Sequence, residues 1–177
     1  AVVNRVAKRI ICVSQGVADV LAAQRVAENR LRVVYNAIDS RPPLPKPVAL
    51  PASAGNLVIG TVGQMTTRKG VHHLLQAVAT LKDEGFALSC LIRGEGPQRA
   101  ELESTARRLG INGQVSFLGF QAQPLAWVQA MDVCVLCSCK EGLPRVVLEA
   151  MLARTPVIGS DATGTRELIV HDETGLL

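Results

Sequence analysis

The chain has 177 residues, 48% of them apolar, which is enough for one full domain with a real core and part of another. No apolar run could span a bilayer and the first ten residues lack the apolar stretch of a secretory signal, so we expect a soluble, cytoplasmic protein. The net charge of +4 arises in residues 1–47. Because the chain has only five aromatic residues and no basic stripe, nucleic acid is excluded as a partner. Weak peripheral contact of the basic N-terminal segment with an anionic membrane stays open.

The N-terminal segment has the pattern of a strand, a helix and a second strand. Arg9–Ser14 is predicted to be a short buried strand, residues 15–23 a helix, and Leu31–Tyr35 a second extended piece. Five prolines follow within residues 41–55. Because proline fixes the backbone and removes a hydrogen-bond donor, we predict an extended linker and a domain boundary there.

Strands and helices alternate along the rest of the chain. We predict strands at residues 57–62, 87–92, 115–118, 133–136 and 157–159. We predict helices at 70–83, 98–109, 124–130 and 144–153, and a helical turn at 166–170. This alternation predicts an α/β fold, in which a parallel sheet carries helices on both faces. Ligands of such sheets bind outside the carboxyl ends of the strands, so the loops there are the candidate site.

Three of those loops carry groups that suit a phosphate-bearing sugar. They are residues 63–70, 93–97 and 140–144. Gly63 lets the backbone approach an anion, Arg68 and Lys69 offer positive charge, and a helix beginning at Gly70 offers free N–H groups. On this loop alone, the alternative is that Gly63 only turns the chain and both cations are solvated.

Two candidate cofactor sites do not fit their patterns. Residues 94–96 read Gly-Glu-Gly, but Arg99 stands where a dinucleotide fingerprint needs its third glycine. Cys134, Cys137 and Cys139 lie close together, yet no histidine is near and zinc would want a fourth ligand. We therefore expect reduced core and loop cysteines, no cofactor and no essential metal.

Glu141 and Glu149 form a spaced pair of carboxylates. The first lies in a loop, and the second lies about two turns into a helix that Pro144 opens. A carboxylate at position 149 could accept from two neighbouring hydroxyls, such as a ribose diol. Glu141 could contact the transferred sugar or stabilise positive charge at its anomeric carbon. Taken alone, both residues could equally be ordinary surface acids.

The segment Glu141–Met151, EGLPRVVLEAM, resembles the E-x7-E element of retaining family 4 glycosyltransferases. The order of the other pieces is also similar, namely residues 33–39, 63–70, 93–97, 115–120 and 155–168, so the resemblance covers nearly the whole chain. It implies a GT-B fold, with residues 1–40 as closing elements of the acceptor domain, 41–54 as linker, and 55–177 as the Rossmann-like donor domain. The resemblance also implies that both ends are truncated.

The resemblance assigns roles to individual residues. Lys69 would bind the donor diphosphate, Glu141 the sugar hydroxyls, and Glu149 the ribose. The backbone near Phe120 would meet the base, and amides at the start of the helix would approach the phosphate and the sugar. The predicted site comprises Glu141 as the catalytic residue and a donor-binding set of Gly63, Arg68, Lys69, Gly94, Phe120, Gly142, Leu143, Arg145 and Glu149.

The sequence departs from the family pattern at three positions. Gln64 stands where the family usually has a phosphate-binding arginine, so a contact of about 1.5–3 kcal/mol is lost unless Arg68 reaches the same phosphate. Pro144 replaces a frequent glycine. Arg154 replaces a glycine after the helix, where a left-handed turn would disfavour it.

The resemblance implies a transferase that moves a sugar from a nucleotide-diphosphate sugar to a saccharide or lipid-linked acceptor, with retention. Cell-surface polysaccharide or glycolipid synthesis is the expected setting. Because catalysis needs both substrates held between two domains, this fragment should bind the donor and transfer nothing. A sugar-nucleotide epimerase of related fold and a noncatalytic nucleotide-binding scaffold remain alternatives.

Overall fold

The computed structural model describes residues 7–41, 43–50 and 55–177. Its centre is a parallel sheet of five strands in the order β5-β4-β3-β6-β7. The strands are β3 (Leu57–Val62), β4 (Leu88–Arg93), β5 (Val115–Gly119), β6 (Val133–Leu136) and β7 (Val157–Gly159). The predicted parallel α/β sheet is therefore confirmed, with strand ends that differ by one residue at most.

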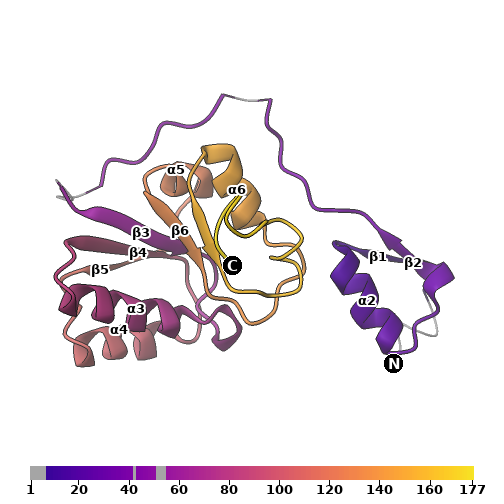
Figure 1. Cartoon of the computed structure of the whole chain (residues 1–177), viewed down its shortest axis with the longest axis horizontal. Helices are drawn as coiled ribbons and strands as arrows, with labels where there is room; N and C mark the ends of the chain where they lie inside the picture. The colour runs from indigo at the N-terminus through magenta and orange to yellow at the C-terminus, as the bar shows by residue number, and fades with distance from the viewer. Residues whose placement is uncertain (1–6, 42, 51–54) are drawn as a thin grey trace.

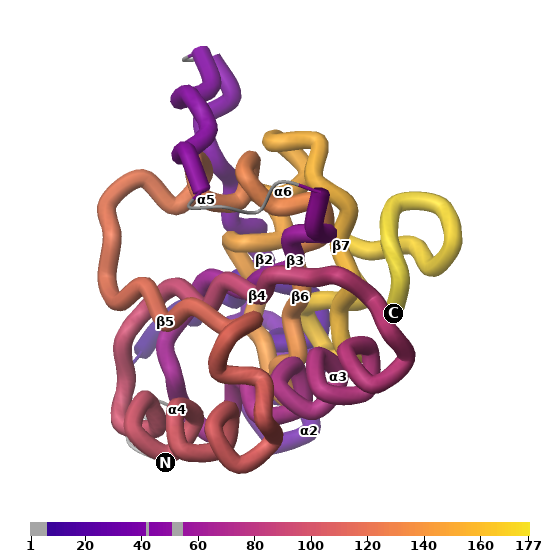
Figure 2. The backbone as a smooth tube through the Cα atoms, turned by 90° about the vertical axis from the view of Figure 1, so that its left-hand side faces the viewer, coloured from indigo at the N-terminus to yellow at the C-terminus, as the bar shows by residue number. Residues whose placement is uncertain are grey.

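Helices cover both faces of this sheet (Figures 1 and 2). One face carries α3 (Val71–Asp83) and α4 (Arg99–Arg108); the other carries α5 (Pro124–Val128) and α6 (Arg145–Ala153). Apolar residues at helical spacing in this segment predict one buried face of α3. Val71, Leu74, Leu75 and Val78 are buried as this spacing predicts, and Leu81 is partly buried. The predicted helical turn at 166–170 is instead part of a run of turns. No helix among the described residues is long and apolar enough to cross a membrane.

The strand order places a crevice between β3 and β6. The chain builds β3, β4 and β5 in one direction across the sheet, then returns to place β6 and β7 on the other side of β3. At this reversal the loops that follow β3 and β6 diverge onto opposite faces. In open α/β sheets this is where ligands bind. The loops of residues 63–70 and 137–144 flank that crevice.

The N-terminal residues form a small unit of their own. Strand β1 (Ile10–Cys12) pairs in parallel with β2 (Leu31–Val33), and α2 (Gln15–Ala23) and the 3-10 turn η1 (Glu28–Arg30) connect them. Their buried core comprises Cys12, Ala18, Val26 and Leu31. The chain then runs to β3 without a helix or strand among its described residues (Figure 1).

Glu167 fastens the N-terminal unit to the loops of the large sheet. Its carboxylate accepts hydrogen bonds from the backbone N–H groups of Gln15, at 2.9 Å, and Gly16, at 2.7 Å. These are the first residues of α2, where the helix dipole favours an anion. Although burial alone would raise the pKa of Glu167, the hydrogen bonds from Gly16 and Gln15 lower it below its usual value.

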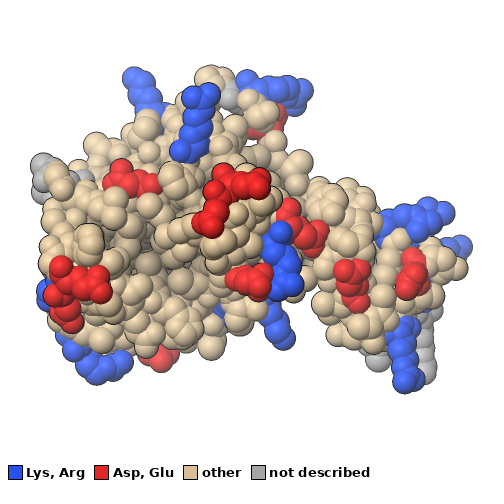
Figure 3. Space-filling model, in the orientation of Figure 1, with Lys and Arg blue, Asp and Glu red and all other residues tan. Residues whose placement is uncertain are grey.

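A second contact crosses the same junction. The side-chain amide of Asn36 donates to the carbonyl oxygen of Leu143 at 3.0 Å, so the segment that follows β2 contacts the loop before α6. In the view of Figure 3, acidic and basic side chains meet where the N-terminal unit joins the rest of the molecule. The N-terminal unit therefore lies directly beside the loop that contains Glu141.

Replacing Arg154 by glycine is expected to stabilise the chain by about 1 kcal/mol. Arg154 closes α6 in the left-handed region, at φ 59°, where a side chain crowds the following carbonyl and glycine does not. Urea unfolding should show a higher midpoint for Arg154→Gly at an unchanged slope. An Arg145→Gly control, at the other end of the helix, should be destabilised by a similar amount.

Candidate functional site

A cleft of about 400 Å³ opens at the carboxyl ends of β3 and β4 and before the N-terminus of α6. Its lining residues are Val62, Lys69, Arg93, Pro124, Glu141, Leu143, Pro144, Arg145, Val146 and Glu149. Five of these were predicted site residues: three come from two of the predicted loops, and Arg145 and Glu149 come from α6. The cleft lies at the reversal of the strand order, so topology and side chains point to the same place.

Lys69 and Glu141 meet inside this cleft. The Lys69 Nζ lies 2.5 Å from Glu141 Oε1, and the two side chains are only 19% and 9% exposed. The 3-10 turn η2 (Thr67–Lys69) presents the lysine, and the loop after β6 presents the carboxylate. A shielded pair of this kind places one positive and one negative group within reach of the same ligand.

Glu149 lies at the middle of α6 and lines the same cleft. Burial raises the pKa of its carboxyl, and the nearby charges of Arg145 and Arg93 lower it by less. The Arg145 Nη2 is 4.0 Å away, and its side chain is mostly exposed. Glu149 is therefore a half-buried hydrogen-bond acceptor whose ionised form is disfavoured by burial, and carboxyl groups in this condition are common at binding sites.

Arg93 begins the candidate loop of residues 93–97 but was not among the predicted site residues. It ends β4, it is only 5% exposed, and it lines the cleft. Its buried Nε has no hydrogen-bond partner among the described residues, and burial lowers the pKa of its guanidinium, while Glu149 raises it by less. The available signal was a charged residue at the last position of an otherwise buried apolar strand.

Glycines let the loops of β3 and β4 pack backbone against backbone. The Gly63 N–H donates to the carbonyl of Arg93 at 2.9 Å, extending the strand pairing into the loop. Gly94 has φ +136°, and a Cβ there would overlap the Gly63 carbonyl oxygen. Gly63 itself has room for a Cβ. Close approach of the two backbones therefore requires glycine at position 94 more than at position 63, where it was predicted.

The start of α6 offers backbone donors to the cleft. Pro144, which was predicted to open the helix, is instead its N-cap, so α6 begins one residue later than predicted, and no side chain caps the helix there. Leu143 is buried beneath it, and Arg145 is the first helical residue. Gly142 touches the backbone of Gly164, which leaves no space for a side chain at 164. An uncapped N-terminus of this kind favours an anion.

Phe120 follows the last residue of β5 and is not among the residues that line the cleft. Its ring is 80% exposed, and the Arg93 Cζ lies 5.9 Å from its centroid. The loop that it begins leads to Pro124, which lines the cleft. The predicted role of this loop in meeting a base is compatible with that position.

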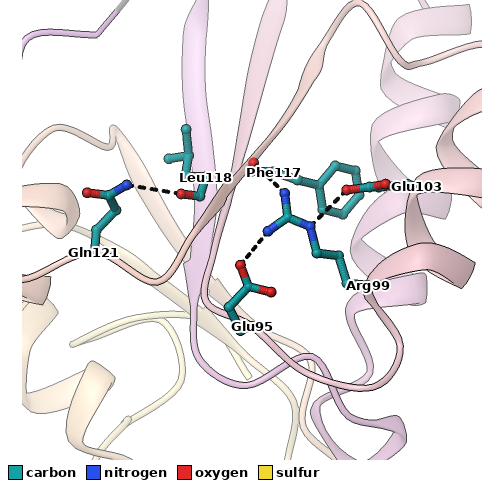
Figure 4. A network of polar contacts seen from close by, with 6 residues as sticks. All are labelled: Glu95, Arg99, Glu103, Phe117, Leu118 and Gln121. Atoms are coloured by element: carbon teal, nitrogen blue, oxygen red, sulfur yellow. Dashed lines mark hydrogen bonds and ion pairs between the residues drawn. The ribbon is translucent and has the colours of Figure 1, made fainter.

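A polar network fixes the adjoining loops (Figure 4). The Arg99 guanidinium contacts Glu95, donates to Glu103 at 2.9 Å, and donates to the carbonyl of Phe117 at 3.3 Å. The Gln121 side chain donates to the carbonyl of Leu118. Arg99, which breaks the dinucleotide fingerprint, thus ties the loop after β4 to β5.

Arg68 and Gln64 lie away from the cleft. Arg68 lines a separate pocket of about 330 Å³ between α2 and the loop of residues 140–142. Gln64 is exposed and is not among the lining residues. Arg68 therefore lies outside the cleft that contains Lys69, although its own pocket is also lined by Glu141 and Gly142.

Other features of the described residues offer weaker candidates. A hollow of about 290 Å³ at the opposite end of the sheet has no charged lining residue, so it suits a diphosphate poorly. All five cysteines are described and free, and Cys90 and Cys134 are buried. No group of three or more potential metal ligands occurs among the described residues.

The sequence matches the family described as glycosyl transferases group 1 over residues 46–177. The chain belongs to this family. Among group 1 relatives, it is 38% identical over 165 residues to the 2-deoxystreptamine glucosyltransferase of Streptomyces kanamyceticus, covering 86% of this chain and 42% of that protein. It is 32% identical over 180 residues to the lipopolysaccharide core biosynthesis glycosyltransferase LpsE of Rhizobium meliloti (strain 1021), covering 95% and 48%.

The fold of this group 1 chain is similar to that of Anabaena Alr3699/HepE. The structure of that protein in complex with UDP and glucose matches with a TM-score of 0.87 and 28% identity, covering 99% of this chain and 50% of the other. Its complex with UDP-glucose matches equally well, at 29% identity. The chain therefore spans about half the length of these relatives.

Replacing Glu149 by glutamine is expected to stabilise this group 1 chain by about 1 kcal/mol at pH 7. Burial raises the pKa of the Glu149 carboxyl in the folded state, so the ionised carboxylate destabilises the fold at any pH above that pKa. As the pH falls through the folded-state pKa to the pKa of the unfolded chain, the carboxyl is protonated and this destabilisation disappears. Urea unfolding should show that Glu149→Gln raises the free energy of unfolding above that of the wild type at pH 7 and raises it by less at pH 4. The exposed Glu173→Gln should change neither value; a destabilised Glu149→Gln at pH 7 would contradict the argument.

Proposed function

We propose that this chain is the donor-binding part of a glycosyltransferase that moves a sugar from a nucleotide-diphosphate sugar to a saccharide or lipid-linked acceptor. The observation that carries the proposal is the convergence of Lys69, Arg93, Glu141 and Glu149 on one cleft at the reversal of the strand order. A shielded cation suits an ionised diphosphate, and two carboxylates suit the hydroxyls of the sugars on either side of it.

Each group has a place along such a donor. Lys69 neutralises the diphosphate, whose negative charge grows as the bond to the sugar breaks. The uncapped N-terminus of α6 adds backbone donors to the same oxygens. Glu141, paired with Lys69, faces the transferred sugar, and Glu149 accepts from the ribose hydroxyls.

Retention and the absence of an essential metal are part of the proposal. Retention rests on the similarity of residues 141–151 to the E-x7-E element of retaining enzymes. The positive charge that a metal would supply comes from Lys69 and the start of α6 in this scheme. A setting in cell-surface polysaccharide or glycolipid synthesis is supported by relatives such as the lipopolysaccharide core enzyme LpsE.

The chain alone should bind the donor and transfer nothing. It spans about half the length of its relatives, and transfer requires the acceptor to be held against the donor. The N-terminal unit already touches the loop before α6 through Asn36, so this side of the cleft is where the acceptor half would close.

Calorimetric titration with uridine, guanosine and adenosine diphosphate glucose tests the proposal. At least one donor should bind, and Glu149→Gln should weaken it roughly tenfold by removing a charge-assisted acceptor. Glu173→Gln, an exposed glutamate far along the chain, is the matched control and should bind normally. Silence from the whole panel would refute donor binding, and sugar transfer by the chain alone would contradict the need for an acceptor half.

A further inference from the structure

A buried, incompletely satisfied guanidinium faces the cleft. Arg93 is 5% exposed and its Nε lacks a partner among the described residues. A guanidinium carries five donors and no acceptor, and a buried donor that has no hydrogen-bond partner destabilises the fold. The fold tolerates this cost at a residue that lines the site, which indicates that a ligand atom supplies the missing acceptor.

Its neighbours place Arg93 at one end of the cleft. The guanidinium lies 5.9 Å from the ring centroid of Phe120, and Glu149 is close enough to raise the pKa of Arg93. The ammonium of Lys69 is instead engaged with Glu141. In the proposed donor site, Glu149 holds the ribose and Lys69 the diphosphate. Arg93 therefore lies at the nucleoside end.

The surroundings of Arg93 suit a planar heterocycle. Phe120 is 80% exposed, so a base could stack on its ring, and Pro124, four residues further along the chain, lines the cleft. The planar fork of arginine donates to neighbouring acceptors on the edge of a base. Uracil and guanine present carbonyl oxygens on that edge, whereas adenine presents an amino donor there.

We infer that Arg93 is a specificity-determining residue that donates to a carbonyl oxygen of the donor base and favours uridine or guanosine diphosphate sugars over adenosine diphosphate sugars. This inference rests on the proposed donor site and adds the class of base to it. In this arrangement the ring of Phe120 stacks on the face of the base, and Arg93 donates to the edge of the base.

The discriminating variant is Arg93→Met, which keeps an unbranched apolar stem and removes every donor. Uridine, guanosine and adenosine diphosphate glucose are titrated into the wild-type chain and this variant. The wild type should bind at least one of the first two roughly tenfold more tightly than the third. In Arg93→Met that ratio should fall to about one, mainly because the preferred donor weakens.

Two further variants separate shape from charge. Arg93→Lys keeps the charge and loses the planar fork, so it should retain overall affinity better than Arg93→Met while losing the preference. Arg107→Met, an exposed arginine of α4, is the control and should leave both quantities unchanged. Thermal melting of each variant confirms that it is folded before titration.

The outcomes separate this inference from the function on which it rests. Equal weakening of all three donors by Arg93→Met would assign Arg93 to the phosphates or the ribose and overturn its role in reading the base. An unchanged ratio would overturn it as well. Failure of the wild type to bind any donor would instead remove the proposed function, and the inference with it.

Discussion

Replacement of Gly94 by alanine is expected to lower the free energy of unfolding by about 3 kcal/mol. At φ +136° an L side chain is strained, and its Cβ would overlap the Gly63 carbonyl oxygen where the loops after β3 and β4 meet. The thermal midpoint should fall by roughly 6–12 °C. Because the loops must move apart to admit the methyl group, donor affinity should fall at temperatures where the chain is still folded.

Gly113→Ala is the matched control. A Cβ at this glycine meets no atom within 4 Å, and the residue is not among those of positive φ. It should therefore retain wild-type stability and binding. A Gly94→Ala chain that melted within about 2 °C of wild type would show that the two loops are not in backbone contact.

Lys69→Gln should weaken donor binding by roughly 10- to 100-fold, since a hydrogen bond to a charged group contributes about 1.5–3 kcal/mol. The substitution also leaves the shielded Glu141 without its cation, so stability should fall as well. Calorimetry with UDP-glucose and urea unfolding measure the two effects. Lys46→Gln, an exposed lysine of the linker, should change neither.

The double variant Lys69→Gln/Glu141→Gln separates these effects. Removing both charges should recover much of the stability lost in Lys69→Gln, because no uncompensated carboxylate remains. Donor affinity should stay low, because the diphosphate still lacks its cation. Additive losses of stability in the double variant would argue that the two side chains do not interact.

The arrangement of the sheet could be predicted from the sequence because the strands alternate regularly with helices. Strands such as Val133–Leu136 and Leu57–Val62 were bounded correctly, and the apolar stripe of α3 identified its buried face. Gathering of Lys69, Glu141 and Glu149 at one edge followed from parallel strands, whose carboxyl ends share that edge. Helix starts were less certain, and Pro144 caps α6 instead of opening it.

What the sequence could not predict depends on side-chain direction and distant contacts. Arg68 and Lys69 are consecutive, but in a 3-10 turn successive side chains point about a third of a turn apart, so only Lys69 reaches the cleft. The contact of Glu167 with Gln15 joins residues 152 positions apart. Arg93 was passed over because local pattern does not reveal which strand-end side chain lacks a partner.

The most direct test of the donor site is an NMR titration of the isotopically labelled chain with UDP-glucose, following every backbone amide. If the donor binds there, the shifts should concentrate on Gly63, Gly142, Leu143 and Arg145, around the cleft between β3 and α6. Shifts confined to Phe86 and Gln114, at the opposite end of the sheet, would contradict it.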